Sequence, residues 1–197
     1  MKELIIATKN KKKLHELRKY LKGLRADIRS MVDLHRIPRI IENGNTFKKN
    51  AIKKAVVISK FTEGLVLADD SGLAVEALGG RPGVRSSRFA GPGKSDRQNN
   101  RKLLDELESF SPEKRSAKFI CAIAIADKGR VVNVIEEECK GRIAFSPKGK
   151  HGFGYDPLFL IPKYNKTFGE LGPKVKDRIS HRAKALKKAR KFLGEYI

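Results

Sequence analysis

Short apolar runs and helix-spaced leucines follow one another at the start of the chain. The run Leu4–Ala7 predicts a buried strand, and leucines recur at helical spacing across residues 11–22. A second strand is expected over residues 28–32. A strand, a loop and a helix in this order are typical of an α/β layer structure.

The middle of the chain predicts two capped helices around a short strand. Thr46 is the expected N-cap of a helix whose apolar positions lie within residues 51–59. The apolar run Leu65–Ala68 predicts a short strand that ends where two aspartates follow. Residues 79–94, rich in Gly, Pro and Arg, predict a loop, and Asp96 is the expected cap of the next helix.

The last third of the chain predicts a hairpin, a glycine-rich loop and a final helix. Two apolar runs, 119–126 and 131–138, flank a turn that contains glycine and so predict a β-hairpin. A loop over residues 149–155 precedes the apolar run 158–161, and Ser180 is the expected cap of the last helix. Because helices and strands do not alternate strictly, we expect a mixed sheet rather than a doubly wound parallel one.

The length and hydropathy of the chain favour a single cytoplasmic domain. The 197 residues suit one domain over 1–197, and 40% hydrophobic residues are enough for a substantial core. No apolar run approaches the roughly eighteen residues of a membrane span. The first residues do not resemble a signal peptide. We therefore expect a cytoplasmic protein that does not contact a membrane.

A large positive charge changes this picture. The chain has 44 Lys and Arg against 22 Asp and Glu, a formal net charge of +22. Such a surplus attracts polyanions, so one interpretation is a nucleic-acid-binding protein. The other is a solvated basic surface that draws in small phosphorylated substrates. No aromatic-rich stacking sequence accompanies the basic clusters, which favours the second interpretation, with no specific nucleic-acid partner.

Two further patterns argue against other chemistries. Cys121 and Cys139 lack CxxC spacing and a nearby His cluster, so a zinc site is not expected, and buried thiols are favoured over a disulfide. The sequence 91–95 (GPGKS) resembles the end of a P-loop. That motif requires a glycine where Arg88 stands and a strand before it, so we exclude a P-loop enzyme.

The strongest candidate chemistry lies in the acidic sequence after Leu65–Ala68. Neighbouring residues of an extended chain point to opposite faces, so Asp69 and Asp70 have different surroundings, and one carboxylate can hold Mg²⁺. Glu42, just before a helix, is a candidate second metal ligand. Each has a simpler interpretation, an acidic turn for the aspartates and a helix-dipole contact for Glu42.

Basic and glycine-rich segments supply candidate ligand contacts. The segment Thr8–Lys13 joins a strand to a helix, where backbone N–H groups and lysines suit a triphosphate, although it also reads as a solvated loop. In residues 152–157 two glycines allow the backbone to approach a flat ligand closely, and Phe153 could stack on a base. The alternative interpretation is a tight turn whose two aromatic residues lie in the core. Residues 180–182, with Lys176 upstream, offer donors to keto and phosphate oxygens or simply begin a helix.

Six segments in this order resemble one family, the inosine/xanthosine triphosphate pyrophosphatases, also called non-canonical purine NTP pyrophosphatases. The matching segments are Thr8-x-Asn10-x-x-Lys13-x-x-Glu16, Thr46-Phe47-x-x-Asn50-Ala51-x-x-Lys54-Ala55, Ala68-Asp69-Asp70-Ser71-Gly72-Leu73, Gly80-x-Pro82-Gly83-Val84-x-Ser86-x-Arg88-Phe89-Ala90-Gly91, Gly152–Pro157 and Ser180-His181-Arg182. They span nearly the whole chain. Each segment is weak alone, but together they are specific.

The resemblance implies an elongated, two-lobed α/β fold around a long mixed β-sheet with flanking helices, an ITPase-like fold with a nucleotide cleft between the lobes. It also implies a homodimer. By similarity, Asp70 is the catalytic base and a Mg²⁺ ligand, and Glu42 is a further ligand. The implied substrate contacts are Thr8, Lys9, Asn10, Lys11, Lys12, Lys13, Ser71, Arg88, Phe153, Gly154, Tyr155, Asp156, Lys176, His181 and Arg182.

The implied reaction is attack of water on the α-phosphorus of ITP, dITP or XTP, which releases pyrophosphate and the monophosphate. The chain departs from the family at Lys9 and Ser87, where smaller residues are common, and at Lys11 and Lys12, which make the loop more basic. Two alternatives stay open: a nucleic-acid-binding protein, and a pyrophosphatase for other modified nucleotides.

Overall fold

The computed structural model describes residues 2–34 and 37–197. The chain divides into two compact units, each built from separate stretches of sequence. Unit 1 comprises residues 1–70, 121–137 and 182–197, and unit 2 comprises residues 71–120 and 138–181.

The elements form the mixed α/β fold that the sequence predicts. The strands are β1 (Lys2–Ile6), β2 (Ala26–Ser30), β3 (Leu65–Val75), β4 (Ser116–Asp127), β5 (Arg130–Ile143), β6 (Phe159–Ile161) and β7 (Lys166–Thr167). The α-helices are α1 (Lys11–Leu21), α2 (Phe47–Ser59), α3 (Asp96–Glu106), α4 (Phe168–Ile179) and α5 (His181–Tyr196). Short 3₁₀ turns are η1 (Met31–Asp33), η2 (Glu76–Leu78), η3 (Gly83–Arg88), η4 (Pro112–Lys114) and η5 (Pro162–Tyr164). Within the described residues, no helix is both long enough and apolar enough to span a membrane.

The seven strands follow the order β2-β1-β3-β4-β5-β6-β7. β1 is parallel to both neighbours, so that Leu4 lies opposite Ile28 on β2 and Leu65 on β3. β6 is antiparallel to β5 and to β7. β4 and β5 are joined by Lys128 and Gly129, whose positive φ angles of 44° and 80° suit a two-residue hairpin turn. The predicted hairpin and the predicted mixed sheet are therefore confirmed.

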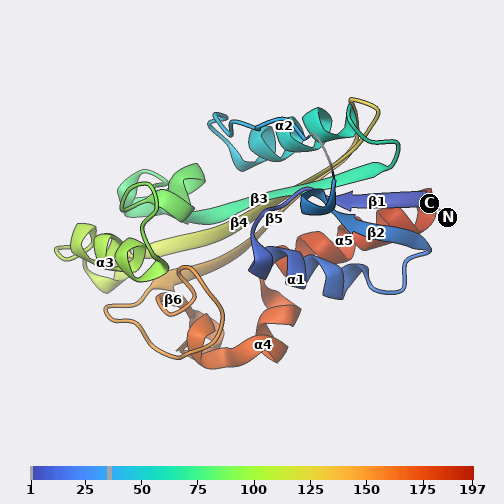
Figure 1. Cartoon of the computed structure of the whole chain (residues 1–197). Helices are drawn as coiled ribbons and strands as arrows, with labels where there is room; N and C mark the ends of the chain where they lie inside the picture. The colour runs from blue at the N-terminus through green and yellow to red at the C-terminus, as the bar shows by residue number, and fades with distance from the viewer. Residues whose placement is uncertain (1, 35–36) are drawn as a thin grey trace. The chain divides into compact units, whose positions relative to one another are not determined.

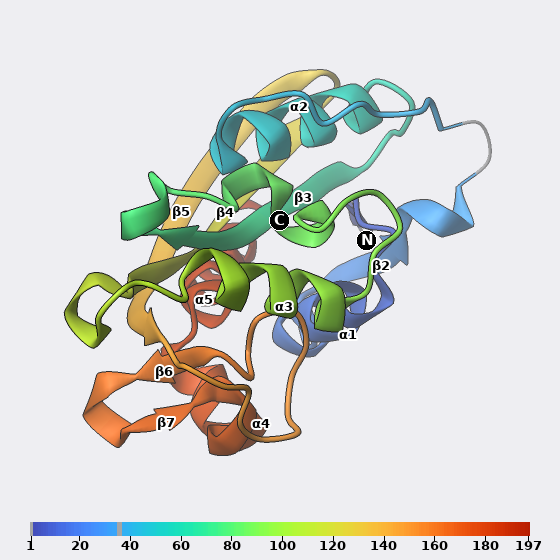
Figure 2. The same ribbon diagram turned by 90° about the vertical axis from the view of Figure 1, so that its left-hand side faces the viewer.

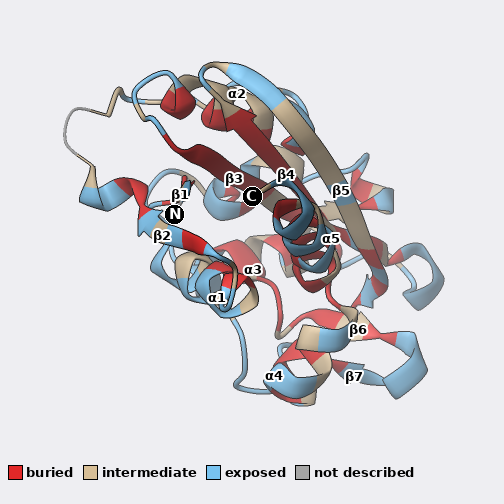
Figure 3. Cartoon of the chain, turned by 90° about the vertical axis from the view of Figure 1, so that its right-hand side faces the viewer, coloured by how far each residue is buried: buried red, intermediate tan, exposed pale blue. Residues whose placement is uncertain are grey.

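The core of unit 1 forms because α1 and α5 cover one face of the strands. Leu17 and Leu21 of α1, and Leu186 and Leu193 of α5, are fully buried against the apolar side chains of β1, β3 and β4. Figure 1 shows both helices on one side of these strands and α2 on the other. Since helices cover both faces of the sheet here, β3 and β4 are buried along most of their length (Figure 3). Cys121 on β4 is a buried free thiol, as predicted.

The core of unit 2 is richer in aromatic residues. The Phe119 ring lies 4.5 Å from that of Phe159, which in turn lies 5.4 Å from Phe168, the first residue of α4. Figure 2 shows α4 beside β6 and β7. Cys139 is a second buried thiol and belongs to this core.

The prediction for β3 was wrong in its length. β3 continues through Asp69 and Asp70 to Val75, so the two aspartates lie inside the strand and not at its end. The sequence DDSG has turn chemistry, but here the polar side chains find tertiary partners and Leu73 and Val75 are buried. β1 ends at Ile6, opposite Leu67. The carboxylates therefore still lie beyond the carboxyl end of the parallel pairing.

Two smaller predictions were also wrong, and two further features were not predicted. Ser95, not Asp96, caps α3, because its side chain accepts from Gln98 N. β2 begins at Ala26 and ends at Ser30, where a capped 3₁₀ turn starts. Within the predicted loop 79–94, residues 83–88 form η3. α4 was not predicted from the sequence, because Gly172 and Pro173 interrupt its helical pattern with a kink.

Candidate active site

Asp69 and Asp70 face different surroundings, as their neighbouring positions in a strand require. In unit 1, Asp69 contacts the cation Lys13 from α1, with 2.8 Å between Oδ2 and Nζ. Asp70 instead accepts a hydrogen bond from Asn50 on α2, with 3.0 Å between Oδ2 and Nδ2. The sequence predicted that the two aspartates have different surroundings. In the structure, one carboxylate lies in a cationic cluster and the other beside an amide.

The surroundings of Asp70 favour a carboxylate that readily takes up a proton. Its side chain is buried, and burial raises the pKa of this carboxyl above its usual value, a shift that Lys13 and the Asn50 hydrogen bond partly oppose and Glu42 reinforces. Asn50 is itself fixed, because its Oδ1 accepts from Gly44 N at 2.8 Å. Asp70 is therefore oriented and electrostatically suited to act as a base.

Asp69 has the opposite electrostatic balance. Burial alone would raise the pKa of its carboxyl, but Lys13, Arg182 and Lys54 lower that pKa to about 2. Arg182 Nε lies 3.9 Å from Asp69 Oδ2. Asp69 is therefore a fixed negative charge that gathers cations from three helices.

Lys54 joins Glu42 to the aspartates. Its Nζ donates to the backbone carbonyl of Asp69 at 3.0 Å and lies 2.5 Å from Glu42 Oε1. Burial would lower the pKa of this lysine, but the negative charges of Asp69, Glu42 and Asp70 raise it. Lys54 therefore stays protonated between these carboxylates. Sequence reasoning gave no role to Lys54 or Asn50. Their four-residue spacing, which puts both on one face of α2, is the signal that could have found them.

The Thr8–Lys13 segment is ordered by its own polar side chains. Asn10 caps α1, since its Oδ1 accepts from the backbone N–H of Lys12 and of Lys13. Thr8 Oγ1 accepts from Asn10 N at 3.2 Å. Lys13 is brought to the carboxylates, whereas Lys9, Lys11 and Lys12 are exposed. The cap N–H groups predicted to face an anion are thus already bonded to Asn10.

Unit 2 brings Phe153, Asp156 and Lys176 together. Asp156 Oδ2 accepts from Phe153 N at 2.8 Å and lies 2.5 Å from Lys176 Nζ. The same Nζ lies 4.9 Å from the centre of the Phe153 ring, within cation–π range. Through these contacts Asp156 holds the loop in place.

The rest of the glycine-rich loop is fastened to α3 and to the core. Gly154 N donates to Asp96 Oδ2 at 2.8 Å, and Gly154 O accepts from Asn100 Nδ2 at 3.1 Å. The Tyr155 hydroxyl donates to Ser86 O at 2.9 Å, and burial raises the pKa of that phenol. The Tyr155 ring therefore belongs to the core, and any substrate contact from this residue would come from its backbone.

Three of the remaining predicted residues lie at the ends of elements, and the fourth, Ser71, lies within β3. His181 begins α5 and is buried in unit 2, where its ring stacks on Phe119 with 4.7 Å between centroids. Arg182, in unit 1, donates to Glu16 Oε2 at 2.7 Å, a partner that sequence reasoning left without a role. Arg88 is exposed at the end of η3, and Ser71 is half-buried on β3.

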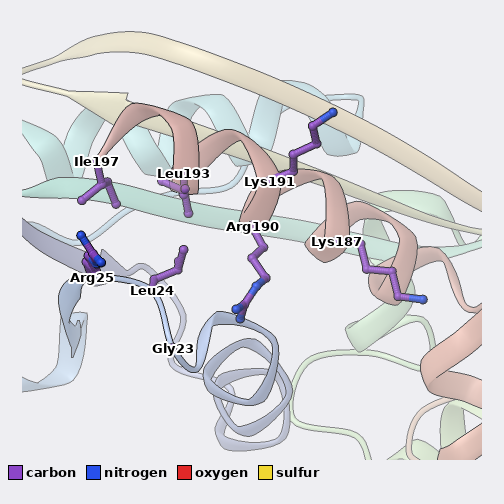
Figure 4. Close-up of a pocket in the computed structure, with 9 residues that line it drawn as sticks. Gly23, Leu24, Arg25, Lys187, Arg190, Lys191, Leu193 and Ile197 are labelled. Atoms are coloured by element: carbon purple, nitrogen blue, oxygen red, sulfur yellow. The ribbon is translucent and has the colours of Figure 1, made fainter.

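A pocket of about 610 Å³ in unit 1 is lined by none of the predicted site residues. Its lining residues are Gly23, Leu24, Arg25, Lys187, Arg190, Lys191, Leu193, Gly194 and Ile197. Figure 4 shows Arg190 directed toward the turn at Gly23, while Lys187 and Lys191 extend away from Arg25. Arg190 donates to Tyr20 O at 2.8 Å. These cations do not converge, and the candidate chemistry stays with β3.

The fold and these clusters define an α/β protein whose buried carboxylates and lysines suit a phosphorylated ligand. The chain belongs to the Ham1 family, whose family model matches residues 4–192.

Individual relatives match over nearly the whole chain. A dITP/XTP pyrophosphatase from Geobacillus kaustophilus is 48% identical over 188 residues, covering 95% of this chain and 92% of that protein. A dITP/XTP pyrophosphatase from Bacillus licheniformis is 48% identical over 195 residues, covering 99% of this chain and all of that protein. The solved structure of a HAM1 protein from Coxiella burnetii, 40% identical, has a TM-score of 0.90 and covers 99% of this chain and 100% of its own. The family resemblance and the mixed α/β fold class drawn from the sequence are confirmed.

Proposed function

We propose that this protein hydrolyses the non-canonical purine nucleoside triphosphates ITP, dITP and XTP to the monophosphate and pyrophosphate, and so cleanses the nucleotide pool. Two relatives that match nearly the whole chain carry the name dITP/XTP pyrophosphatase. The observation that carries the proposal is the cluster in unit 1, where Asp70, Glu42 and two lysines meet around one strand.

The donor set of this cluster fits Mg²⁺. Among the described residues, no three His, Cys, Asp or Glu side chains group together as a metal site. Mg²⁺ commonly needs one or two carboxylates from the protein and takes its other ligands from phosphates and water. Asp70 and Glu42 supply two such carboxylates, close enough that the charge of Glu42 raises the pKa of Asp70. We propose that these two residues hold the ion.

The chain's own residues then carry the reaction. Mg²⁺, when bound, would supply positive charge to the phosphate oxygens. Asp70 orients the attacking water and accepts its proton as the oxygen bonds to the α-phosphorus. The bond to the β-phosphate oxygen breaks, and pyrophosphate leaves with its electron pair. Lys13 and Lys54 offset the negative charge that gathers on the phosphate chain.

The other proposed contacts divide between phosphate and base. We propose that residues 8–13 bind the phosphate tail, and that Ser71 and Arg88 contact the substrate. For the base, we propose stacking on Phe153 and contacts from the Gly154–Asp156 backbone, Lys176, His181 and Arg182. The order of the Phe153 loop, tied by Asp156 to Lys176, supports a preformed site for a flat ligand.

Base selection follows from the donors. A keto oxygen at purine C6, as in hypoxanthine, accepts from His181 or Arg182, whereas the amino group of adenine does not. A site with committed donors rejects such a mismatch strongly. Comparison of ITP and ATP hydrolysis by His181→Ala and Arg182→Ala tests this assignment, and unchanged discrimination in both variants would remove it.

We further propose that residues 1–197 act as one domain and that the enzyme works as a cytoplasmic homodimer. Family membership supports these proposals. Sedimentation equilibrium of the purified protein tests the dimer.

A pyrophosphate-release assay tests the function. We expect ITP, dITP and XTP to release pyrophosphate in the presence of Mg²⁺, with little release from ATP or from any substrate when the ion is chelated. Modified pyrimidine triphosphates in the same panel test the alternative specificity. A panel in which no purine triphosphate releases pyrophosphate would end the proposal.

A further inference from the structure

A network of four charged side chains, linked one to the next, lies beside the proposed catalytic carboxylate. Lys13 Nζ is 2.8 Å from Asp69 Oδ2, and Arg182 Nε is 3.9 Å from the same oxygen. Arg182 Nη1 is also 2.7 Å from Glu16 Oε2. Glu16 follows Lys13 by three residues on α1, so both point to the same side of that helix. The network therefore ties α1 and the start of α5 to β3.

Asp69 is the buried member of this network. Its side chain is 1% exposed, against 27% for Glu16. Its Oδ1 has no hydrogen-bond partner among the described residues. A buried carboxylate in contact with two cations is a poor source of stability, because apolar residues of similar volume often stabilise a core as well or better. We therefore look for the role of Asp69 in its effect on Lys13 and Arg182.

Those partners are residues that the proposed reaction uses directly. Lys13 is the proposed phosphate contact and Arg182 a proposed base contact, and they come from helices far apart in the sequence. Figure 1 shows α1 and α5 on the same side of β3. A lysine on a free surface samples many rotamers, whereas a buried counter-charge selects one. Asp69 is thus the one side chain that contacts both Lys13 and Arg182.

We propose that Asp69 is a positioning residue that touches neither the substrate nor the attacking water, and that it fixes Lys13 and Arg182 before the substrate binds. The proposal rests on the proposed function, since it assigns to Lys13 and Arg182 the roles given there. It separates the tasks of two adjacent carboxylates. Asp70 meets the reacting groups, and Asp69 holds the cations that receive the phosphate chain and the base.

A double-mutant cycle with Lys13 tests the proposal. The four proteins are wild type, Asp69→Asn, Lys13→Met and the double variant, with kcat and KM measured for dITP and binding of pyrophosphate alone measured by calorimetry. A misplaced contact in an active site costs about 10²-fold, so we expect Asp69→Asn to lower kcat/KM by about that factor and to weaken pyrophosphate binding. In the Lys13→Met background, we expect the same change to have little further effect on pyrophosphate.

Additive losses in the cycle, or unchanged pyrophosphate binding in Asp69→Asn, would overturn the proposal. Glu3→Gln is the matched control, because Glu3 also forms an ion pair in unit 1, with Arg29 at 2.7 Å, and lies outside the proposed site. This variant should keep the wild-type kcat, KM and pyrophosphate affinity. A wild type that binds pyrophosphate but hydrolyses no triphosphate would reject the proposed function and leave the positioning role to be judged by binding.

Nuclear magnetic resonance decides the question if Asp69→Asn does not fold. In the free wild-type protein, the Lys13 ammonium held by a buried carboxylate should exchange its protons with water slowly enough to give a ¹⁵N-lysine signal, assigned by its loss in Lys13→Met. Exchange as fast as that of exposed Lys9 would show that Asp69 does not hold Lys13, and the proposal would fall.

Discussion

Asp70 is the residue on which the proposed chemistry depends. Replacement by Asn keeps its size and its contact with Asn50 but removes the negative charge and the proton acceptor. Because loss of one key electrostatic group in a site of this kind costs about 10²–10³-fold, we expect kcat to fall by about that factor in Asp70→Asn. Pyrophosphate release from ITP measures the effect. A thermal melt should show a folded protein, and wild-type turnover would contradict the role of Asp70.

Asp69 gives a prediction about stability and pH. The pKa of its carboxyl in the folded protein is about 2, against roughly 4 in an unfolded chain. A group whose pKa is lowered by folding stabilises the fold above its unfolded pKa, and this contribution disappears as the pH falls through the folded pKa. Relative to a carboxyl that stays protonated, ionisation of Asp69 stabilises the fold by about 2 kcal/mol near neutral pH.

Urea unfolding of wild type and Asp69→Asn, at pH 5 and again near pH 2.5, measures this contribution. Every other carboxylate is present in both proteins, so the difference between their free energies of unfolding isolates Asp69. We expect the difference to shrink by about 1–2 kcal/mol at the lower pH. A difference that does not change with pH would mean that the cations do not act on Asp69 as described.

Some residues of the site were predictable from the sequence and others were not. Asp70, Glu42 and Lys13 stand in recognisable segments, and the structure brings them into one cluster in unit 1. Lys54 and Glu16 were overlooked because a helical lysine or glutamate is ordinarily solvated. Their role becomes visible only when the fold supplies their partners, the Asp69 carbonyl and Arg182.

At the scale of elements, β3 is a strand whose length the sequence pattern did not predict. The sequence DDSG reads as a turn, yet the strand passes through it because Asp69 pairs with Lys13 and Asp70 accepts a hydrogen bond from Asn50. Close approach of η3 then requires Gly72, since a Cβ there would lie 2.3 Å from Ser86 Oγ. Strongly periodic elements such as α1, α2 and the β4–β5 hairpin were predictable, because their patterns depend on local geometry alone.

Gly72→Ala tests this packing. The added methyl would also lie 2.9 Å from the Gly83 backbone carbonyl, so η3 must move and the Ser86 hydrogen bond to Leu73 N must lengthen. Overpacking of this kind costs about 1–3 kcal/mol, and we expect that loss in urea unfolding. Gly194→Ala on α5 is the control, since its nearest neighbour would be 3.9 Å away, and it should be neutral or slightly stabilising.

At the scale of the whole molecule, the net charge of +22 attracts anionic ligands, a nucleotide as well as a nucleic acid. A general positive field raises the encounter rate with a triphosphate but is screened over about 8 Å at physiological salt. The buried contacts of Lys13 and Lys54 are screened much less. The field should therefore affect substrate capture more than the chemical step.

Salt should consequently raise KM for dITP several-fold between about 50 and 200 mM while kcat changes little. Binding to duplex and single-stranded DNA should fall far more steeply, because each phosphate contact contributes counterion release. A Lys187→Glu/Lys191→Glu variant reverses two exposed charges of α5 outside the proposed site. It should weaken DNA binding and keep kcat. DNA binding that is tight, prefers one sequence and survives physiological salt would instead favour a nucleic-acid function, because charge alone supplies none of these properties.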